Sequence, residues 1–152
     1  MQGCVAVLVA VVALVGAQHP THQPPQTHTC NCGAFISMDH AEYEIHRLPP
    51  FDALDCDDTK ECGKSCAAEW KRITGDGDLE HDLPNGYSVG QELCIGLNNG
   101  HGIDSCYKET VYVYSNTCDG PWIWDGVNSI DELCCHDGHY HDCSTLPPHP
   151  PQ

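Results

Sequence analysis

The chain has 152 residues, and its 22 acidic and 6 basic side chains give a formal net charge of −16 at pH 7 with histidine counted as neutral. This charge disfavours nucleic acid and anionic membrane surfaces as partners, because like charges repel. It favours cations or an extracellular protein as the partner. A chain of this length can hold one modest core rather than two domains.

The first segment, residues 1–17, is predicted to be a cleavable secretion signal. Val5 to Leu14 form an apolar run, and the small residues Val15-Gly16-Ala17 precede Gln18. The run is too short to span a bilayer, and no second apolar stretch follows, so we predict a secreted protein without a transmembrane segment. Cleavage removes Cys4, one of the chain's 12 cysteines, and leaves eleven.

The remaining cysteines predict a disulfide framework, because secreted cysteine-dense domains are stabilised by disulfides rather than by zinc or free thiols. The cysteines delimit one domain, residues 30–143. A flexible Pro/His-rich arm (18–29) precedes it and a flexible Pro-rich tail (144–152) follows it. We expect five intrachain bridges, whose pairing the sequence does not determine, and one unpaired thiol at Cys30, Cys32 or Cys143. The unpaired thiol could link two chains into a dimer. The structural cysteines are Cys30, Cys32, Cys56, Cys62, Cys66, Cys94, Cys106, Cys118, Cys134, Cys135 and Cys143.

In the first half of the domain, residues 41–46 alternate between apolar and polar side chains, which predicts a strand that ends before Pro49-Pro50. Residues 58–73 predict the clearest helix. Asp58 and Glu61 form a capping pattern at its start, and Gly75 ends it. Its spacing places one set of side chains on a single buried face: Cys62, Cys66, Trp70 and Ile73.

In the second half, Ser88 is predicted to cap a short helix over residues 88–97, and residues 107–114 (YKETVYVY) predict a strand. Two turns, at 119–121 and 125–126, are expected around the aromatic segment 122–124. Ser129 and Glu132 suggest a last helix running into Cys134-Cys135. The elements mix, so the predicted class is α+β: a small disulfide-rich domain with short helices, a small antiparallel sheet and much irregular structure.

Two segments carry the pattern of a hydrolase. Gly86-Tyr87-Ser88-Val89-Gly90 matches the nucleophile elbow, but no hydrophobic strand precedes it. Residues 134–143 resemble the active-site segment of secreted phospholipases, in which a Cys pair precedes His-Asp. Here His136 follows the pair directly, whereas that family places two residues between them. A small hydrolase that uses Ser88 or this segment is therefore our third hypothesis, and we assign no catalytic residue.

The same segment offers metal ligands, because imidazole and carboxylate groups bind zinc or copper, and acidic groups attract calcium. A metal-binding protein is our second hypothesis. Our first hypothesis, a non-enzymatic extracellular protein, requires no cofactor. The candidate ligands are His136, Asp137, His139, His141 and Asp142.

The aromatic set Tyr112, Tyr114, Trp122 and Trp124 is expected to pack in the core, with an exposed platform for sugar or peptide as the alternative. Our first hypothesis is a non-enzymatic extracellular protein. It would act by binding, or as a component of matrix, mucus, a defensive fluid or venom.

Overall fold

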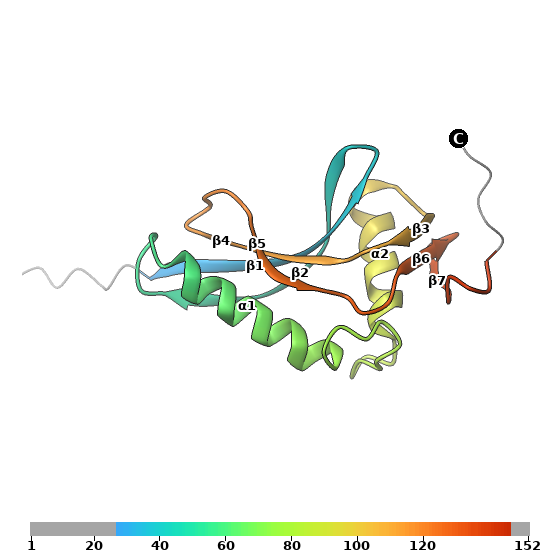
Figure 1. Ribbon diagram of the computed structural model, residues 1–152, viewed down its shortest axis with the longest axis horizontal. Helices are drawn as coiled ribbons and strands as arrows, with labels where there is room; N and C mark the ends of the chain where they lie inside the picture. The colour runs from blue at the N-terminus through green and yellow to red at the C-terminus, as the bar shows by residue number, and fades with distance from the viewer. Residues whose placement is uncertain (1–26, 147–152) are drawn as a thin grey trace, which may run out of the picture.

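A computed structural model describes residues 27–146, and it contains two helices and seven strands that form two antiparallel sheets (Figure 1). With its disulfides, this agrees with the predicted small disulfide-rich α+β fold. The predicted signal segment 1–17, most of the arm and the end of the tail lie outside the described residues. The first strand begins at His28, inside the segment that we expected to be a flexible arm.

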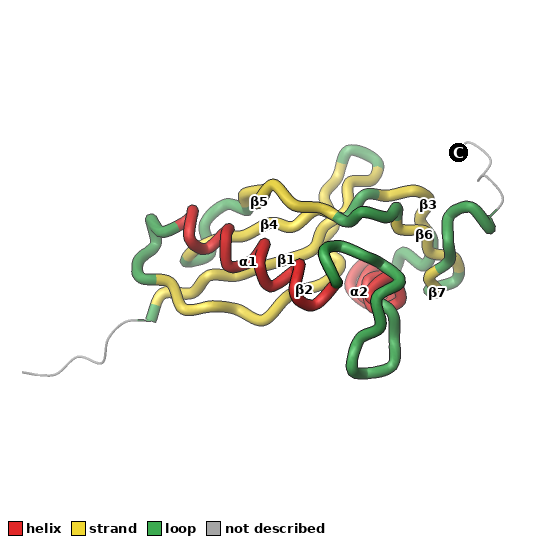
Figure 2. The backbone as a smooth tube through the Cα atoms, turned by 60° about the horizontal axis from the view of Figure 1, so that its bottom comes forward, coloured by secondary structure: helices red, strands yellow, loops and turns green. Residues whose placement is uncertain are grey.

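The larger sheet has the strand order β2-β1-β4-β5, and its edges are β2 and β5. Helix α1 (Thr59–Thr74) lies along one face of this sheet, and α2 (Val89–His101) lies near one end, beside the smaller sheet (Figure 2). The smaller sheet has the order β3-β6-β7. The strands are β1 (His28–Met38), β2 (Ala41–Ala53), β3 (Cys106–Glu109), β4 (Tyr112–Thr117), β5 (Ile123–Asn128), β6 (Leu133–His136) and β7 (His139–Tyr140).

The expected end of a strand at Pro49-Pro50 is wrong, because β2 continues through both prolines to Ala53. In the β1–β2 register, Cys30 pairs with Phe51 and Cys32 pairs with Leu48. The prolines therefore lie in a bulge opposite a single residue of β1. Proline lacks the N–H that a ladder needs, but a bulge in an edge strand does not require that donor.

Helix α1 is held on the sheet as its spacing predicts. Cys62, Cys66 and Trp70 are buried on one face, and Gly75 ends the helix in the left-handed region at φ 60°. Asp58 occupies the N-cap position, but its side chain makes no capping hydrogen bond. Two parallel disulfides, Cys30–Cys62 and Cys32–Cys66, join this face to alternate residues of β1.

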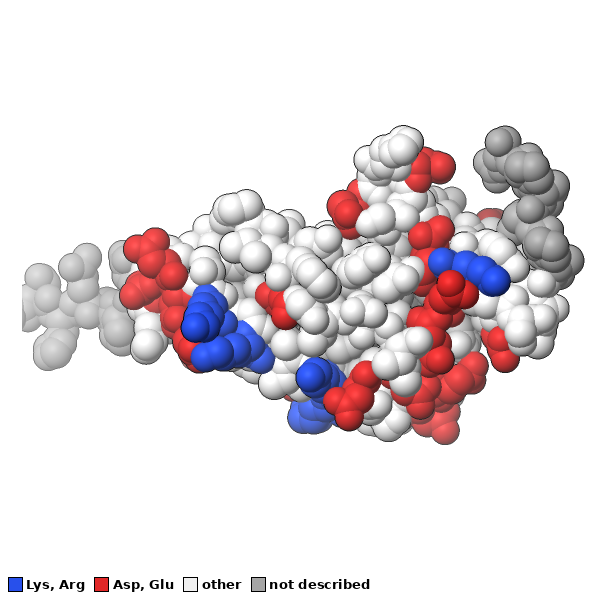
Figure 3. All heavy atoms as spheres, viewed as in Figure 1, with Lys and Arg blue, Asp and Glu red and all other residues white. Residues whose placement is uncertain are grey.

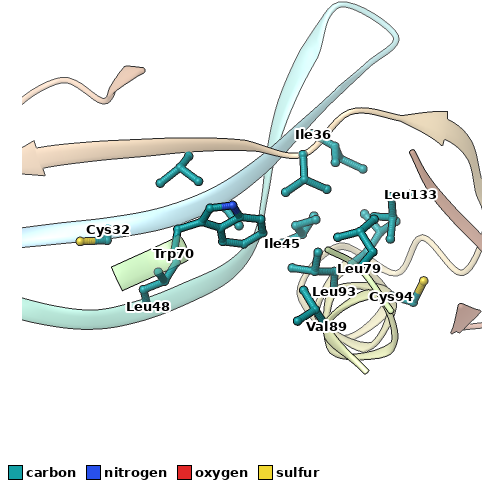
Figure 4. Close-up of a cluster of buried hydrophobic side chains, with 14 of the residues drawn as sticks. Cys32, Ile36, Ile45, Leu48, Trp70, Leu79, Val89, Leu93, Cys94 and Leu133 are labelled. Carbon is teal, nitrogen blue, oxygen red and sulfur yellow. The ribbon is translucent and has the colours of Figure 1, made fainter. Parts of the chain in front are cut away.

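The core continues from α1 to α2, and Figure 4 shows the buried side chains running from Trp70 of α1 to Ile45 and Leu133 beside α2. Leu93 and Leu97 on α2 are buried there. Helix α2 begins as predicted at Ser88, whose hydroxyl accepts a hydrogen bond from the Gln91 N–H at 3.2 Å.

Five disulfides form, in the number that the cysteine count predicts, and the other three are Cys56–Cys118, Cys94–Cys135 and Cys134–Cys143. The expected position of the unpaired thiol is wrong, because Cys30, Cys32 and Cys143 are all bridged. Within residues 27–146 the unpaired cysteine is Cys106, contrary to the expectation that it is bridged, and it is buried. A buried thiol removes the argument for a disulfide-linked dimer.

Three further expectations fail near the C-terminus. Residues 107–114 do not form one strand: β3 and β4 belong to different sheets. The predicted last helix is replaced by β6, because the Ser129 hydroxyl accepts from the Val111 N–H and donates to the Asp131 carbonyl instead of capping a helix. Residues 125–126 lie within β5 rather than in a terminal turn, and Gly126 takes a positive φ of 77° there.

Candidate functional site

The side of the larger sheet that faces away from α1 carries a continuous group of aromatic residues, which we call the aromatic face. The register places its members together: Gly33 pairs with Arg47 on one side and with Tyr114 on the other, and Tyr114 pairs with Trp124. Directly paired residues point to the same side of an antiparallel sheet. The aromatic face consists of Gly33, Phe35, Glu44, Arg47, Tyr112, Tyr114, Trp122 and Trp124.

The rings of this face contact one another edge to face. The Phe35 ring lies 5.1 Å from that of Tyr114 and 5.0 Å from that of Trp122, measured between centroids. A side chain at Gly33 would enter this space, since a Cβ there would lie 2.7 Å from the Phe35 ring. Glycine therefore lets the rings lie close to the sheet backbone. Edge-to-face pairs at these separations are favourable, so the rings hold one another in place.

A charged pair borders the aromatic rings on the β2 side. The Arg47 guanidinium lies over the Trp122 ring at 5.2 Å from its centroid. It also donates two hydrogen bonds to the Glu44 carboxylate, at 2.5 and 2.6 Å. This pairing raises the pKa of Arg47 further above its ordinary value. Both contacts, with the Trp122 ring and with the Glu44 carboxylate, restrict the Arg47 guanidinium. Polar groups are therefore fixed beside the rings.

Trp124 is the most open ring of the face. Its residue is 52% exposed, and its Nε1–H donates a hydrogen bond to the Val127 carbonyl at 3.1 Å. Tyr112 contacts it edge to face, with the ring centroids 6.3 Å apart. The ring is thus accessible on the surface and oriented by its neighbours.

The expectation that Tyr112, Tyr114, Trp122 and Trp124 pack in the core is wrong, because none of the four is buried. The buried aromatic residues in the described part of the chain are Trp70, between α1 and the sheet, and Phe35, which is the one buried ring of the aromatic face. Four members of the aromatic face are not predicted from the sequence: Gly33, Phe35, Glu44 and Arg47. Gly33 and Phe35 alternate along β1, but Glu44 and Arg47 are three residues apart on β2 and share a face only because the register shifts between Ala34 and Phe35. This arrangement becomes readable only once the pairing of the strands is known.

Charge is distributed unevenly over the molecule. Figure 3 shows basic side chains along α1 and acidic side chains toward both ends of the molecule, with more of them near the smaller sheet. The middle of this view is largely uncharged. One acidic group of β5 is partly buried beneath α1. Asp125 accepts a hydrogen bond from the Ser115 hydroxyl at 2.6 Å, and burial raises its pKa to about 6.

The hydrolase pattern at Ser88 has a structural role in the described residues. The serine caps α2. The residues before it form a loop, in which the Leu83 N–H donates to the Tyr87 carbonyl, and not the strand that a nucleophile elbow needs. The Cys-Cys-His-Asp segment is the β6–β7 hairpin instead of a helix. We assign no catalytic role to either segment.

The candidate metal ligands of residues 136–142 lie on the same hairpin. His136 and His139 are paired across it, the rings of His136 and His141 are 6.3 Å apart, and the Asp142 carboxylate accepts from the Ser144 N–H at 2.8 Å. Within residues 27–146, no three of these ligands bring their donor atoms within 4.8 Å of one another. The cluster is therefore not preassembled as a metal site.

Comparison with protein-family models, with curated proteins and with solved structures finds no match to this chain. None of the helices within residues 27–146 is long and apolar enough to cross a membrane. The bridges and this absence are compatible with a secreted protein. The functional argument therefore rests on the geometry of the molecule itself.

Proposed function

We propose that the protein is a secreted, non-enzymatic binding protein whose aromatic face binds a neutral saccharide chain. The observation that carries the proposal is Trp124, an indole ring that is 52% exposed and yet held by a hydrogen bond and by Tyr112. An ordered exposed ring costs little conformational entropy when a ligand stacks on it.

The chemistry of the surface fits sugars because a pyranose ring has an apolar C–H face and polar hydroxyl edges. Tyr114, Trp122 and Trp124 offer ring surface for stacking. Arg47 and Glu44 offer donors and acceptors at its border. The formal charge of −16 favours a neutral chain over an anionic one. A surface on the face of a sheet suits an extended chain more than a small molecule, which needs a concave pocket.

The disulfide framework supports this role by keeping the sheet rigid. Two bridges fix β1, which carries Gly33 and Phe35 at the centre of the aromatic face, to α1 on the opposite side. The face is therefore organised before a ligand arrives, which reduces the entropy that binding must overcome.

The test is binding of the full-length secreted protein to insoluble neutral polysaccharides, followed by titration with their soluble oligosaccharides, read by tryptophan fluorescence and calorimetry. We expect Trp124→Ala to weaken binding about tenfold or more, equivalent to about 1.4 kcal/mol. Tyr87→Ala is the matched control, because Tyr87 is 49% exposed outside the aromatic face. Saccharide binding that survives both Trp124→Ala and Tyr114→Ala, or no binding to any neutral saccharide, refutes the proposal.

A further inference from the structure

A second cluster lies at the opposite end of the larger sheet from α2, where three segments meet: the start of β1, the loop between β2 and α1, and the residue after β4. His28 Nδ1 lies 3.5 Å from the Cys56 Sγ and 3.6 Å from the Cys118 Sγ. These two sulfurs form a disulfide. The imidazole nitrogen and both sulfurs thus lie within 4.8 Å of one another.

These separations agree with those of a tetrahedral zinc site. Zinc binds thiolate sulfur at about 2.3 Å and imidazole nitrogen at about 2.0–2.1 Å, so neighbouring S and N ligands in a tetrahedron lie about 3.5 Å apart. The two observed N–S distances match that value. Two thiolate ligands would lie about 3.8 Å apart, so the sulfurs must separate once the bond between them is broken, while the imidazole can stay in place.

This bridge is also the most accessible one in the described part of the chain. Cys56 is exposed and Cys118 is half-buried, whereas each of the other four bridges includes at least one buried cysteine. Access governs which disulfide an external thiol attacks first.

Other contacts also hold together the segments that carry this bridge. Cys30–Cys62 and Cys32–Cys66 hold β1 to α1 nearby. The Cys118 N–H donates to the Thr29 carbonyl at 3.0 Å, and the Thr117 hydroxyl donates to the Cys56 carbonyl at 2.7 Å. These contacts keep the two cysteines beside His28 when the bridge is open.

We propose that Cys56, Cys118 and His28 form a reduction-gated binding site for a thiophilic metal ion such as Zn²⁺. A dithiol reductant attacks one sulfur of the bridge, the S–S bond breaks, and the second thiol of the reductant resolves the mixed disulfide. The reductant becomes a cyclic disulfide, and two electrons and two protons pass to Cys56 and Cys118. Zn²⁺ then binds both thiolates and the His28 imidazole, and the two thiol protons are released. This site is independent of the aromatic face.

The first part of the test asks which bridge opens first. Full-length protein is treated with increasing amounts of a phosphine reductant, desalted without oxygen, alkylated and mapped by mass spectrometry. We expect Cys56 and Cys118 to be labelled before any other bridged cysteine. Earlier opening of another bridge overturns the proposal.

The second part measures metal binding to the protein at this stage of reduction. Co²⁺ should give a thiolate-to-metal charge-transfer band that Zn²⁺ abolishes, and the unreduced protein should give none. His28→Ala should weaken Zn²⁺ binding about tenfold or more. His46→Ala, on β2, is the control that should leave it unchanged.

The Cys56→Ser/Cys118→Ser double variant should keep its circular dichroism spectrum and lose the Co²⁺ band. The proposal fails if reduced protein gives no thiolate band, if unreduced protein binds Zn²⁺ equally well, or if His28→Ala and His46→Ala behave alike. Equal binding by unreduced protein would point instead to the hairpin ligands of residues 136–142.

Discussion

Replacement of Gly96 by alanine tests how closely α2 approaches the larger sheet. An added Cβ would lie only 1.7 Å from the backbone carbonyl oxygen of Ile45 on β2. An ordinary contact of carbon with a non-bonded atom is about 3.5 Å, so α2 must move away from β2 by more than about 1 Å. The Cys94–Cys135 bridge and the buried Leu93 and Leu97 restrain this movement.

Overpacking of this kind costs about 1–3 kcal/mol, and a clash with backbone belongs at the upper end of that range. Alanine recovers about 1 kcal/mol through its better helix propensity. We therefore expect Gly96→Ala to lower the free energy of unfolding by about 2 kcal/mol, and to lower Tm by about 6–10 °C in a domain of this size.

Gly100→Ala is a matched control on the same helix, because its added Cβ would meet no atom within 4 Å apart from its chain neighbours and the nearby helix backbone. It should be neutral or stabilising by up to about 1 kcal/mol. The assay is guanidinium and thermal unfolding of the disulfide-intact protein, followed by circular dichroism. If the two variants have equal stability, the close approach of α2 and β2 is incorrect.

Three other predictions address single side chains. Burial raises the pKa of Asp125 from 3.8 to about 6, so the folded state holds the carboxyl proton more tightly than the unfolded state does. The contribution of Asp125 to the free energy of unfolding should therefore fall as pH rises from about 4 to 6. Asp125→Asn should remove this component, which we put at about 1 kcal/mol after allowing for solvent screening, in unfolding measured between pH 4 and 7. Cys106 should resist alkylation in the native protein, because burial raises the pKa of its thiol to about 11. The protein should also run as a monomer on non-reducing gels. Rapid labelling of Cys106 or a covalent dimer would contradict the burial of this thiol. Ser88→Ala should lower the free energy of unfolding by about 1 kcal/mol through loss of the α2 cap; the hydrolase hypothesis would be revived if esterase activity were present and disappeared in this variant.

The parts of the fold that the sequence predicts well are those in which local chemistry and tertiary packing require the same structure. Cys62, Cys66 and Trp70 recur at helical spacing, and Gly75 provides the left-handed residue at which α1 ends. Ser88 likewise caps α2 with its own side chain. In both places the signal lies within a few residues, so neighbouring strands are not needed to interpret it.

The expectations that fail depend on partners distant in sequence. Pro49 and Pro50 end a strand by local rules, but the register with β1 places them in a bulge where no donor is needed. Ser129 has the sequence context of a helix cap, yet its hydroxyl bonds across to Val111. The aromatic face also depends on distant partners, because its residues form one surface only once the strand order and the register are known.

The disulfide pairing follows from geometry that the sequence supplies only in part. Cys30 and Cys32 alternate on a strand and therefore share one face, and Cys62 and Cys66 are four apart on a helix and share another. Two parallel bridges then require only that the helix lie along the strand. Its direction, which decides between Cys30–Cys62 and Cys30–Cys66, is set by the rest of the fold.

The odd cysteine shows where counting alone misleads. Cys106 on β3 is paired in register with Cys135 on β6, but the Cys135 sulfur is already bonded to Cys94 on α2. The Cys106 thiol is left inside the protein, where cysteine behaves as a small apolar side chain. An unpaired cysteine in a secreted domain therefore does not by itself predict a covalent dimer. The burial of the cysteine also matters, and the accessible sulfurs that we propose to be reactive are those of the Cys56–Cys118 bridge beside His28.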